Sequence, residues 1–162
     1  MRPLSPRFDG THALKCELAC EVLRSSGSLR LQVTGWSMLP SVWPGDTLVI
    51  ERANRDAVSE GDIVLFGREQ RLFAHRVVTK PGLPAEELLT RGDAMIALDP
   101  PVSGDDLLGK VSFILRNGRC IEPSRNLHFS ERAVAALVRN SGIAARVVVG
   151  VHNMRQTSTS VT

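Results

Sequence analysis

Aromatic residues and cysteine are scarce in this chain of 162 residues. Two Trp, five Phe and no Tyr leave few side chains on which nucleic-acid bases could stack, so we expect no nucleic-acid partner. Cysteine occurs three times, as Cys16, Cys20 and Cys120, without a Cys-x-x-Cys pair or paired histidines at metal-ligand spacing. We therefore expect no metal site, no other cofactor and no disulfide framework, and we interpret the cysteines as buried thiols in a reducing compartment.

Long hydrophobic runs are also absent from the sequence. Residues 1–10 include two prolines, two arginines and one aspartate, so we expect neither a secretory signal peptide nor an N-terminal membrane anchor. Residues 133–151 are the most apolar stretch, but they contain Arg139 and Arg146. A central Arg costs about 2.5–3.5 kcal/mol on insertion scales, whereas each Leu or Val returns about 0.3–0.6 kcal/mol. We expect a cytoplasmic protein that contacts a membrane only peripherally, if at all.

Length and composition fit one domain with one hydrophobic core, because 43% of the residues are apolar. The net charge is +3, and the 20 basic residues comprise 17 Arg and only three Lys. Arginine favours two-pronged contacts with carboxylates and phosphates. An Arg-rich solvated surface is nevertheless the simpler interpretation of this composition.

Hydrophobic periodicity predicts a mainly β (α+β) fold. In residues 11–24, Leu14, Leu18 and Val22 recur at helical spacing, with Thr11 as a cap and Gly27 near the end. Short apolar runs then follow, separated by turn signals such as Pro-Gly-Asp, Gly-Asp and Asn-Gly. We expect them to form an antiparallel β domain with strands at residues 29–33, 47–50, 63–66, 72–78, 88–90 and 108–115.

The expected divisions of the chain follow from these patterns. We predict an N-terminal amphipathic helix in residues 1–28, the β domain in residues 29–122, a C-terminal helical segment in residues 123–155, and a frayed polar tail in residues 156–162. The helical segment should break near residues 141–142. Its basic helices could dock the protein on a membrane surface.

Three residue types required for serine catalysis occur in order in the β region. Ser37 lies in the segment Gly-Trp-Ser-Met-Leu-Pro, His75 lies in an apolar run, and Asp93 and Asp99 follow. Amide hydrolysis by a serine requires a hydroxyl on a rigid turn, an imidazole to take its proton, and a carboxylate to orient that imidazole. Each residue alone has a plainer explanation as a turn, surface or structural residue, so the order carries the interpretation.

Together these motifs resemble the catalytic domain of type I signal peptidases, in the S24/S26 group that also includes self-cleaving repressor-type peptidases. The resemblance covers residues 31–111 or so and implies that Ser37 is the nucleophile and that Met38 lines the substrate groove. His75, followed by Arg-Val, stands where most bacterial members have a lysine base. This is similar to the endoplasmic-reticulum and archaeal type. The resemblance also implicates both aspartates, with Asp99 as the first choice and Asp93 as the second for the contact to His75.

Two features depart from that family. Members often carry a small hydroxyl residue two positions before the nucleophile, which helps to hold the oxyanion, but Gly35 occupies this position. Backbone N–H groups, chiefly that of Ser37, would have to serve instead, with Thr34 as a conceivable substitute. The expected absence of an N-terminal anchor is the second departure, because signal peptidases meet their substrates at the bilayer.

The leading hypothesis is a serine endopeptidase that cuts proteins or peptides with small residues near the cleavage site, bound as an added strand. The alternative is a peptidase-fold binding or regulatory module that cuts slowly, cuts only itself, or is inactive. A Ser-Lys dyad is disfavoured because Lys80 is the best of only three lysines. A repressor is disfavoured because about 28 residues precede the first strand, too few for a helix-turn-helix domain.

Overall fold

The computed structural model describes residues 10–82, 87–127 and 133–136. Every predicted strand is present, together with the N-terminal helix, so the mainly antiparallel β fold is confirmed. Residues 133–136 are helical, whereas the rest of the predicted C-terminal helices and the tail lie outside the described residues. The elements are α1 (Gly10–Ser26), β1 (Ser28–Gln32), β2 (Thr47–Arg52), the 3-10 helix η1 (Arg55–Ala57), β3 (Ile63–Arg68), β4 (Arg71–Thr79), β5 (Leu89–Arg91), β6 (Leu107–Arg116) and β7 (Arg119–Ile121).

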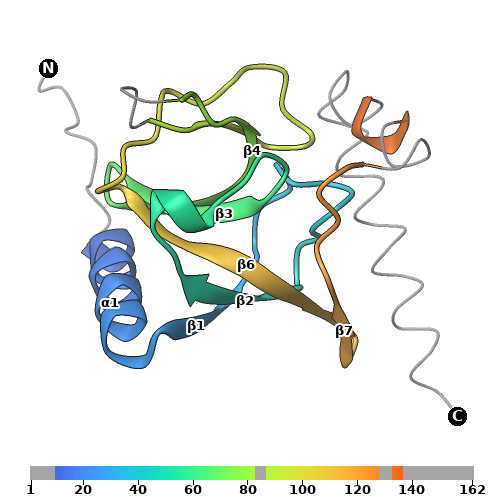
Figure 1. Ribbon diagram of the computed structural model, residues 1–162. Coiled ribbons are helices and arrows are strands. Elements are labelled where there is room, and N and C mark those ends of the chain that lie inside the picture. Colours follow the sequence, from blue (N-terminus) through green and yellow to red (C-terminus); the bar gives the residue numbers. More distant parts are fainter. Residues whose placement is uncertain (1–9, 83–86, 128–132, 137–162) are drawn as a thin grey trace, which may run out of the picture.

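All strands belong to one antiparallel sheet with the order β1-β2-β6-β3-β4-β5, and β7 pairs with β6 through the predicted Asn-Gly hairpin. Strand β6 lies between β2 and β3, so the centre of the sheet joins segments that are far apart in the sequence. The register shifts between Val49 and Ile50, between Leu65 and Phe66, and between Val77 and Thr79. Such bulges increase local twist and bend strands, in keeping with the curled sheet in Figure 1.

Strand β3 contributes to both of the larger core clusters. Successive side chains of a strand point to opposite faces, and four consecutive residues of β3 are buried. Ile63 and Leu65 therefore join one cluster, which includes Met38, whereas Val64 and Phe66 join the other. Burial on both faces fixes β3 and, through its pairing with β4, fixes the strand that carries His75.

Helix α1 packs against β1 and β4, but through a different face from the one predicted. Ala19 and Leu23 are buried, whereas Leu14 and Leu18 are each 55% exposed, so the predicted apolar line is not the packed face. A Cβ at Gly67 would lie 3.2 Å from Cys16 Sγ, which shows that the helix approaches the β3–β4 hairpin closely. Small side chains suit such an approach, and leucines do not.

The helix ends as predicted. Gly27 has a φ of +73° and donates its N–H to the Leu23 carbonyl, a conformation that favours glycine. The side chain of Thr11, the predicted cap, lies outside the described part of the structure.

The three cysteines differ in environment. Cys16 and Cys20 are half-buried on α1, where burial and the neighbouring Cys20 raise the pKa of the Cys16 thiol. Cys120 is exposed on β7, so its interpretation as a buried thiol is wrong. Strand β7 pairs only with the end of β6 and all its residues are exposed, which leaves Cys120 outside the core.

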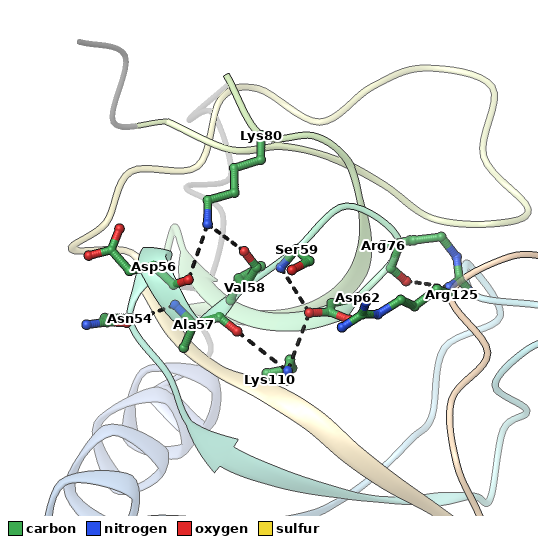
Figure 2. A network of polar contacts seen from close by, with 11 residues as sticks. Asn54, Asp56, Ala57, Val58, Ser59, Asp62, Arg76, Lys80, Lys110 and Arg125 are labelled. Carbon is green, nitrogen blue, oxygen red and sulfur yellow. Dashed lines mark hydrogen bonds and ion pairs between the residues drawn. The ribbon is translucent and has the colours of Figure 1, made fainter. Parts of the chain in front are cut away.

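Two of the predicted turns carry a buried aspartate that binds an arginine from a distant segment. Asp46 accepts the Trp43 N–H at 2.8 Å and the Arg116 guanidinium at 2.7 and 2.9 Å. Asp62 accepts the Ser59 N–H at 3.0 Å and the Arg125 guanidinium at 2.9 Å, as Figure 2 shows. Each carboxylate thus stabilises its own turn and ties that turn to another part of the chain.

The close contact between β2 and β6 predicts the effect of a single methyl group. A Cβ at Gly109 would lie 2.4 Å from the Glu51 carbonyl oxygen and 2.9 Å from Ile50 Cγ2. Because the first neighbour is backbone and cannot move aside cheaply, we expect Gly109→Ala to lower the free energy of unfolding by about 1–3 kcal/mol. Urea unfolding measures this loss.

Gly104→Ala is the matched control for this prediction. A Cβ there would meet nothing within 4 Å, so its effect should stay within about 0.5 kcal/mol. Equal stability of the two variants would contradict the described packing of β2 on β6.

Candidate active site

Ser37 lies in a chain reversal between β1 and β2 that buried side chains hold in place. The following Met38 and Leu39 are 4% and 0% exposed, and Val42 is 1% exposed. The Leu39 N–H bonds to the Trp36 carbonyl, and the Val42 N–H bonds to that of Met38. The Ser37 carbonyl accepts the Ala94 N–H at 2.9 Å. Serine is therefore presented on a turn that is fixed on both sides.

His75 lies on β4, opposite Val64 of β3, and its side chain is 7% exposed. Its ring packs beside Phe66 and Phe73, with both centroids at 6.0 Å. The Nε2 atom lies 2.9 Å from Ser37 Oγ, and the Nδ1 atom lies 2.7 Å from Asp99 Oδ2. The structure thus brings the serine, the imidazole and one of the two candidate carboxylates into a single hydrogen-bonded series.

Asp99 is held by Thr90, a fully buried residue of β5. The Asp99 N–H bonds to the Thr90 carbonyl at 2.9 Å, and the Thr90 hydroxyl donates to Asp99 Oδ2 at 2.7 Å. Burial raises the pKa of the Asp99 carboxyl, but the hydrogen bonds from His75 and Thr90, with the charges of His75 and Arg68, outweigh it. The net pKa lies below its ordinary value. Asp99 is therefore an anion at neutral pH.

An ionised carboxylate only accepts hydrogen bonds, so the Asp99 contact assigns the proton of a neutral His75 ring to Nδ1. Nε2 is then unprotonated and accepts the hydroxyl proton of Ser37. This arrangement has the chemistry of a nucleophile, a base and an orienting acid.

Asp93, the second choice for the contact to His75, is placed elsewhere. It is 5% exposed and accepts Arg76 Nε at 2.7 Å and Arg76 Nη2 at 2.8 Å, together with the Ser41 hydroxyl at 2.5 Å. Ser41 belongs to the same reversal as Ser37, and Arg76 follows His75 on β4. Asp93 therefore links the segment of the serine to the strand of the histidine.

Gly92 makes the closest approach to the serine. A Cβ at this position would lie 2.6 Å from the Ser37 carbonyl oxygen and 3.1 Å from Ser37 Cβ. Residue 92 must therefore be glycine for the 91–94 segment to pack on the Ser37 turn. In the Gly-Asp motif, Gly92 leaves room for this close contact and Asp93 supplies the carboxylate that binds Arg76.

Sequence reasoning missed Thr90, Ser41 and Arg76 as parts of this site. Each binds an aspartate that is between 9 and 52 residues away in the sequence, so no local sequence pattern reveals the contact. The available signals were weak: Arg76 directly follows His75, and Thr90 lies two residues before Gly92.

A groove of about 510 Å³ opens beside Ser37 and His75. Thr34, Gly35 and Met38 are among its lining residues. Its apolar walls come from the region of β1 and from β4, and its charged lining residues come from α1 and the start of β4. The lining residues are His12, Lys15, Leu31, Gln32, Val33, Thr34, Gly35, Ser37, Met38, Val42, Leu48, Leu65, Arg71, Leu72, Phe73, Ala74 and His75.

Lys80, the candidate for a Ser-Lys dyad, lies just after β4 and is engaged with another part of the chain. Its ammonium donates to the carbonyls of Val58 at 2.6 Å and Asp56 at 3.4 Å, and Figure 2 shows both contacts. The side-chain nitrogen that contacts Ser37 Oγ belongs to His75.

Two further findings concern metal ions and membranes. Within the described ranges, no group of three or more His, Cys, Asp or Glu side chains could hold a metal ion. The helices in the same ranges include none with the length and apolar character needed to cross a membrane.

Comparison with known proteins supports the fold. Residues 7–83 match the family model described as Peptidase S24-like, a stretch that includes Ser37 and His75 but ends before Asp93 and Asp99. The match supports a peptidase-like fold of the S24/S26 type for this chain. No curated protein matches the sequence.

The lowered pKa of Asp99 predicts how stability depends on pH. A carboxyl whose pKa is lower in the folded state stabilises the fold above its unfolded pKa, here near 3.8, and this stabilisation is lost as the pH falls through the folded pKa. We expect the wild type to exceed Asp99→Asn in free energy of unfolding at pH 6, with the difference shrinking below about pH 4. Urea unfolding across pH 3–7 measures the difference.

Asp105→Asn is the matched control, because Asp105 is exposed. Its curve should run closer to that of the wild type at every pH. A constant difference between the wild type and Asp99→Asn down to pH 3 would contradict a depressed pKa for Asp99.

Proposed function

We propose that the protein is a serine endopeptidase of the signal-peptidase-like type, with Ser37 as nucleophile, His75 as general base and Asp99 as the residue that orients His75. The observation that carries this proposal is the 2.9 Å contact between Ser37 Oγ and His75 Nε2, with Asp99 2.7 Å behind the ring. The Peptidase S24-like match supports the same class of activity. Asp93 assists indirectly, because it positions Arg76 and Ser41.

The reaction follows from the order of these groups. Ser37 Oγ attacks the scissile carbonyl carbon while His75 Nε2 takes the hydroxyl proton, and Asp99 stabilises the imidazolium. The C–N bond then breaks as Nε2 delivers the proton to the leaving amine, which leaves an acyl-enzyme on Ser37. Water, deprotonated by the same nitrogen, releases the acyl group and restores the serine.

Stabilisation of the oxyanion is the weaker part of this mechanism. Gly35 offers no side-chain donor, so stabilisation falls to the N–H of Ser37, with the Thr34 hydroxyl as a substitute. Loss of one such donor typically costs about 100- to 1,000-fold in rate. We therefore propose a slow enzyme compared with relatives that carry a hydroxyl at this position.

Substrate binding by strand addition fits the open edge of β4. Strand β5 pairs with Arg76, Val77 and Thr79, so the first half of β4 has β3 on one side and the groove on the other. An extended peptide with small residues near the cleavage site can pair with this edge. Contact with a membrane through the C-terminal helices stays a prediction, because residues 137–155 lie outside the described part of the chain.

A binding or regulatory module with the same fold is the second candidate, and Gly35 is the observation that favours it. Such a module would bind extended peptides in the groove but cleave them slowly, cleave only its own chain, or cleave nothing. It requires the groove and not the base, so removal of His75 would leave peptide binding intact.

Removal of the nucleophile or the base tests the enzyme directly. Ser37→Ala and His75→Ala should each lower cleavage by at least about 1,000-fold, because either change removes the activated hydroxyl. The substrates are a protein with an N-terminal signal peptide and a randomised peptide mixture, read by mass spectrometry, with self-cleavage followed during storage.

The matched control is Ser25→Ala, which changes an exposed serine at the end of α1. Equal product from the wild type and both site variants would reveal a contaminating protease. No product from any folded preparation, together with intact peptide binding, would favour the module over the enzyme.

The hydrogen bond from Thr90 to Asp99 predicts a second, smaller effect on catalysis. Thr90→Val keeps the shape of the side chain but removes the hydroxyl that donates to Asp99, so Asp99 should orient His75 less well. We expect kcat to fall about tenfold with KM unchanged, since a hydrogen bond to a charged group contributes about 1.5–3 kcal/mol. Steady-state kinetics on the best peptide substrate measures both constants.

Thr90→Ser should restore kcat because it keeps the donor. Parallel losses of kcat and folded protein in both variants would indicate that Thr90 acts only through packing.

A further inference from the structure

The groove beside Ser37 has a basic end. Besides His75, its lining includes three basic residues, namely His12 and Lys15 of α1 and Arg71 at the start of β4. Among the described residues that line it, none is an aspartate or a glutamate. The other lining residues are mostly apolar, so Lys15 and Arg71 are charged side chains of a largely apolar groove.

The basic end lies away from the serine. Arg71 precedes His75 by four residues on β4, which corresponds to about 13 Å at about 3.3 Å per residue. The close approach of Cys16 Sγ to Gly67, which pairs with Leu72, places the neighbouring Lys15 beside the start of β4. Lys15 and Arg71 therefore come from two elements that meet at the same end of the groove.

These two cations differ from the arginines that hold the fold together. Arg76, Arg116 and Arg125 are each bound to a buried aspartate. Lys15 and Arg71 are exposed and have no carboxylate partner in the part of the chain that the structure describes. The first turn of α1, which contains no acidic residue, adds the positive end of a helix dipole to the same region.

We propose that this end of the groove is a subsite for an acidic side chain of the substrate. An extended peptide that adds to β4 and places its scissile bond at Ser37 would carry its acidic residue about three to five positions from that bond. Lys15 and Arg71 are the specificity-determining residues, with His12 at the same rim. The inference rests on the proposed function, because it assigns the substrate class of that site.

The expected preference is modest. An ion pair at an exposed site changes affinity by at most about fivefold, and two cations acting on one carboxylate should give about 5- to 20-fold. The preference should weaken in 0.5 M salt because exposed charges are screened.

Peptide binding to the full chain tests the subsite independently of catalysis. Fluorescein-labelled decapeptides of Ala, Thr and Val carry one Asp, Lys or Ala, scanned across all positions. Their affinities for the Ser37→Ala variant, which binds without cutting, are measured by fluorescence anisotropy. We expect Asp peptides to bind about 5- to 20-fold more tightly than Lys peptides at one or two positions only.

Charge reversal identifies the residues responsible. Lys15→Glu and Arg71→Glu, each introduced into the Ser37→Ala variant, should abolish the preference for Asp or invert it toward Lys. Arg119→Glu is the matched control: it changes the net charge equally, but it lies on β7, at the opposite side of the molecule from α1 in Figure 1. It should leave the preference unchanged.

The outcomes separate this inference from the proposed function. Equal binding of Asp and Lys peptides, no measurable binding, or an equal effect of all three reversals would overturn the subsite. Cleavage of the same peptides by the wild type without a charge preference would also overturn it while leaving the peptidase intact. A charge preference that Lys15 and Arg71 control, without any cleavage, would support the subsite and count against the peptidase.

Discussion

The contact between Ser37 and His75 depends on one buried ion pair, Arg76 with Asp93. All three guanidinium nitrogens are used: Nε and Nη2 bind Asp93, Nη2 also binds Ser41, and Nη1 binds the carbonyls of Gly61 and Ser124. Burial of a charged pair is costly unless its hydrogen bonds are satisfied, and here they are. The serine and the histidine are 38 residues apart in the sequence, and this ion pair joins β4 to the turn that carries the serine.

The same device recurs at the turns that flank the sheet. Asp46 and Asp62 each follow a glycine with positive φ, accept the N–H three residues earlier, and bind an arginine that is 70 or 63 residues away. Arg116 also donates to the Ser41 carbonyl, so the Asp46 pair contacts the serine turn as well. The Gly-Asp signals are therefore more than turn markers, since each provides a fixed anion for an arginine. We interpreted the arginine-rich composition as a solvated surface. Some of these arginines instead bind buried aspartates and stabilise the fold.

Features with local causes could be predicted from the sequence. The sequences of the strands show alternating or continuous apolar residues, and the predicted strands agree with the structure. The end of α1 at Gly27 and the Asn-Gly hairpin each depend on one or two residues, and they agree as well. The packed face of α1 was mispredicted because leucine outranks alanine and cysteine in hydrophobicity, whereas the close approach to Gly67 selects small side chains. The order of Ser37, His75 and the aspartates was visible, but the choice between Asp93 and Asp99 depends on a fold that joins β4 to both. Thr90 was invisible because its hydroxyl acts through Asp99 alone.

The carboxylate behind the base also bears on why a histidine, and not a lysine, suits this position. A lysine base must be neutral to accept the serine proton, which requires a dry site without a nearby anion. Asp99 is ionised at neutral pH, and Thr90 and Arg68 help to keep its pKa low. An ammonium beside such an anion would hold its proton more tightly and fail as a base. An imidazole is different, since it donates from Nδ1 to the anion while Nε2 stays free to accept. Asp99 and Thr90 therefore suit the proposed histidine mechanism better than a lysine at the same position.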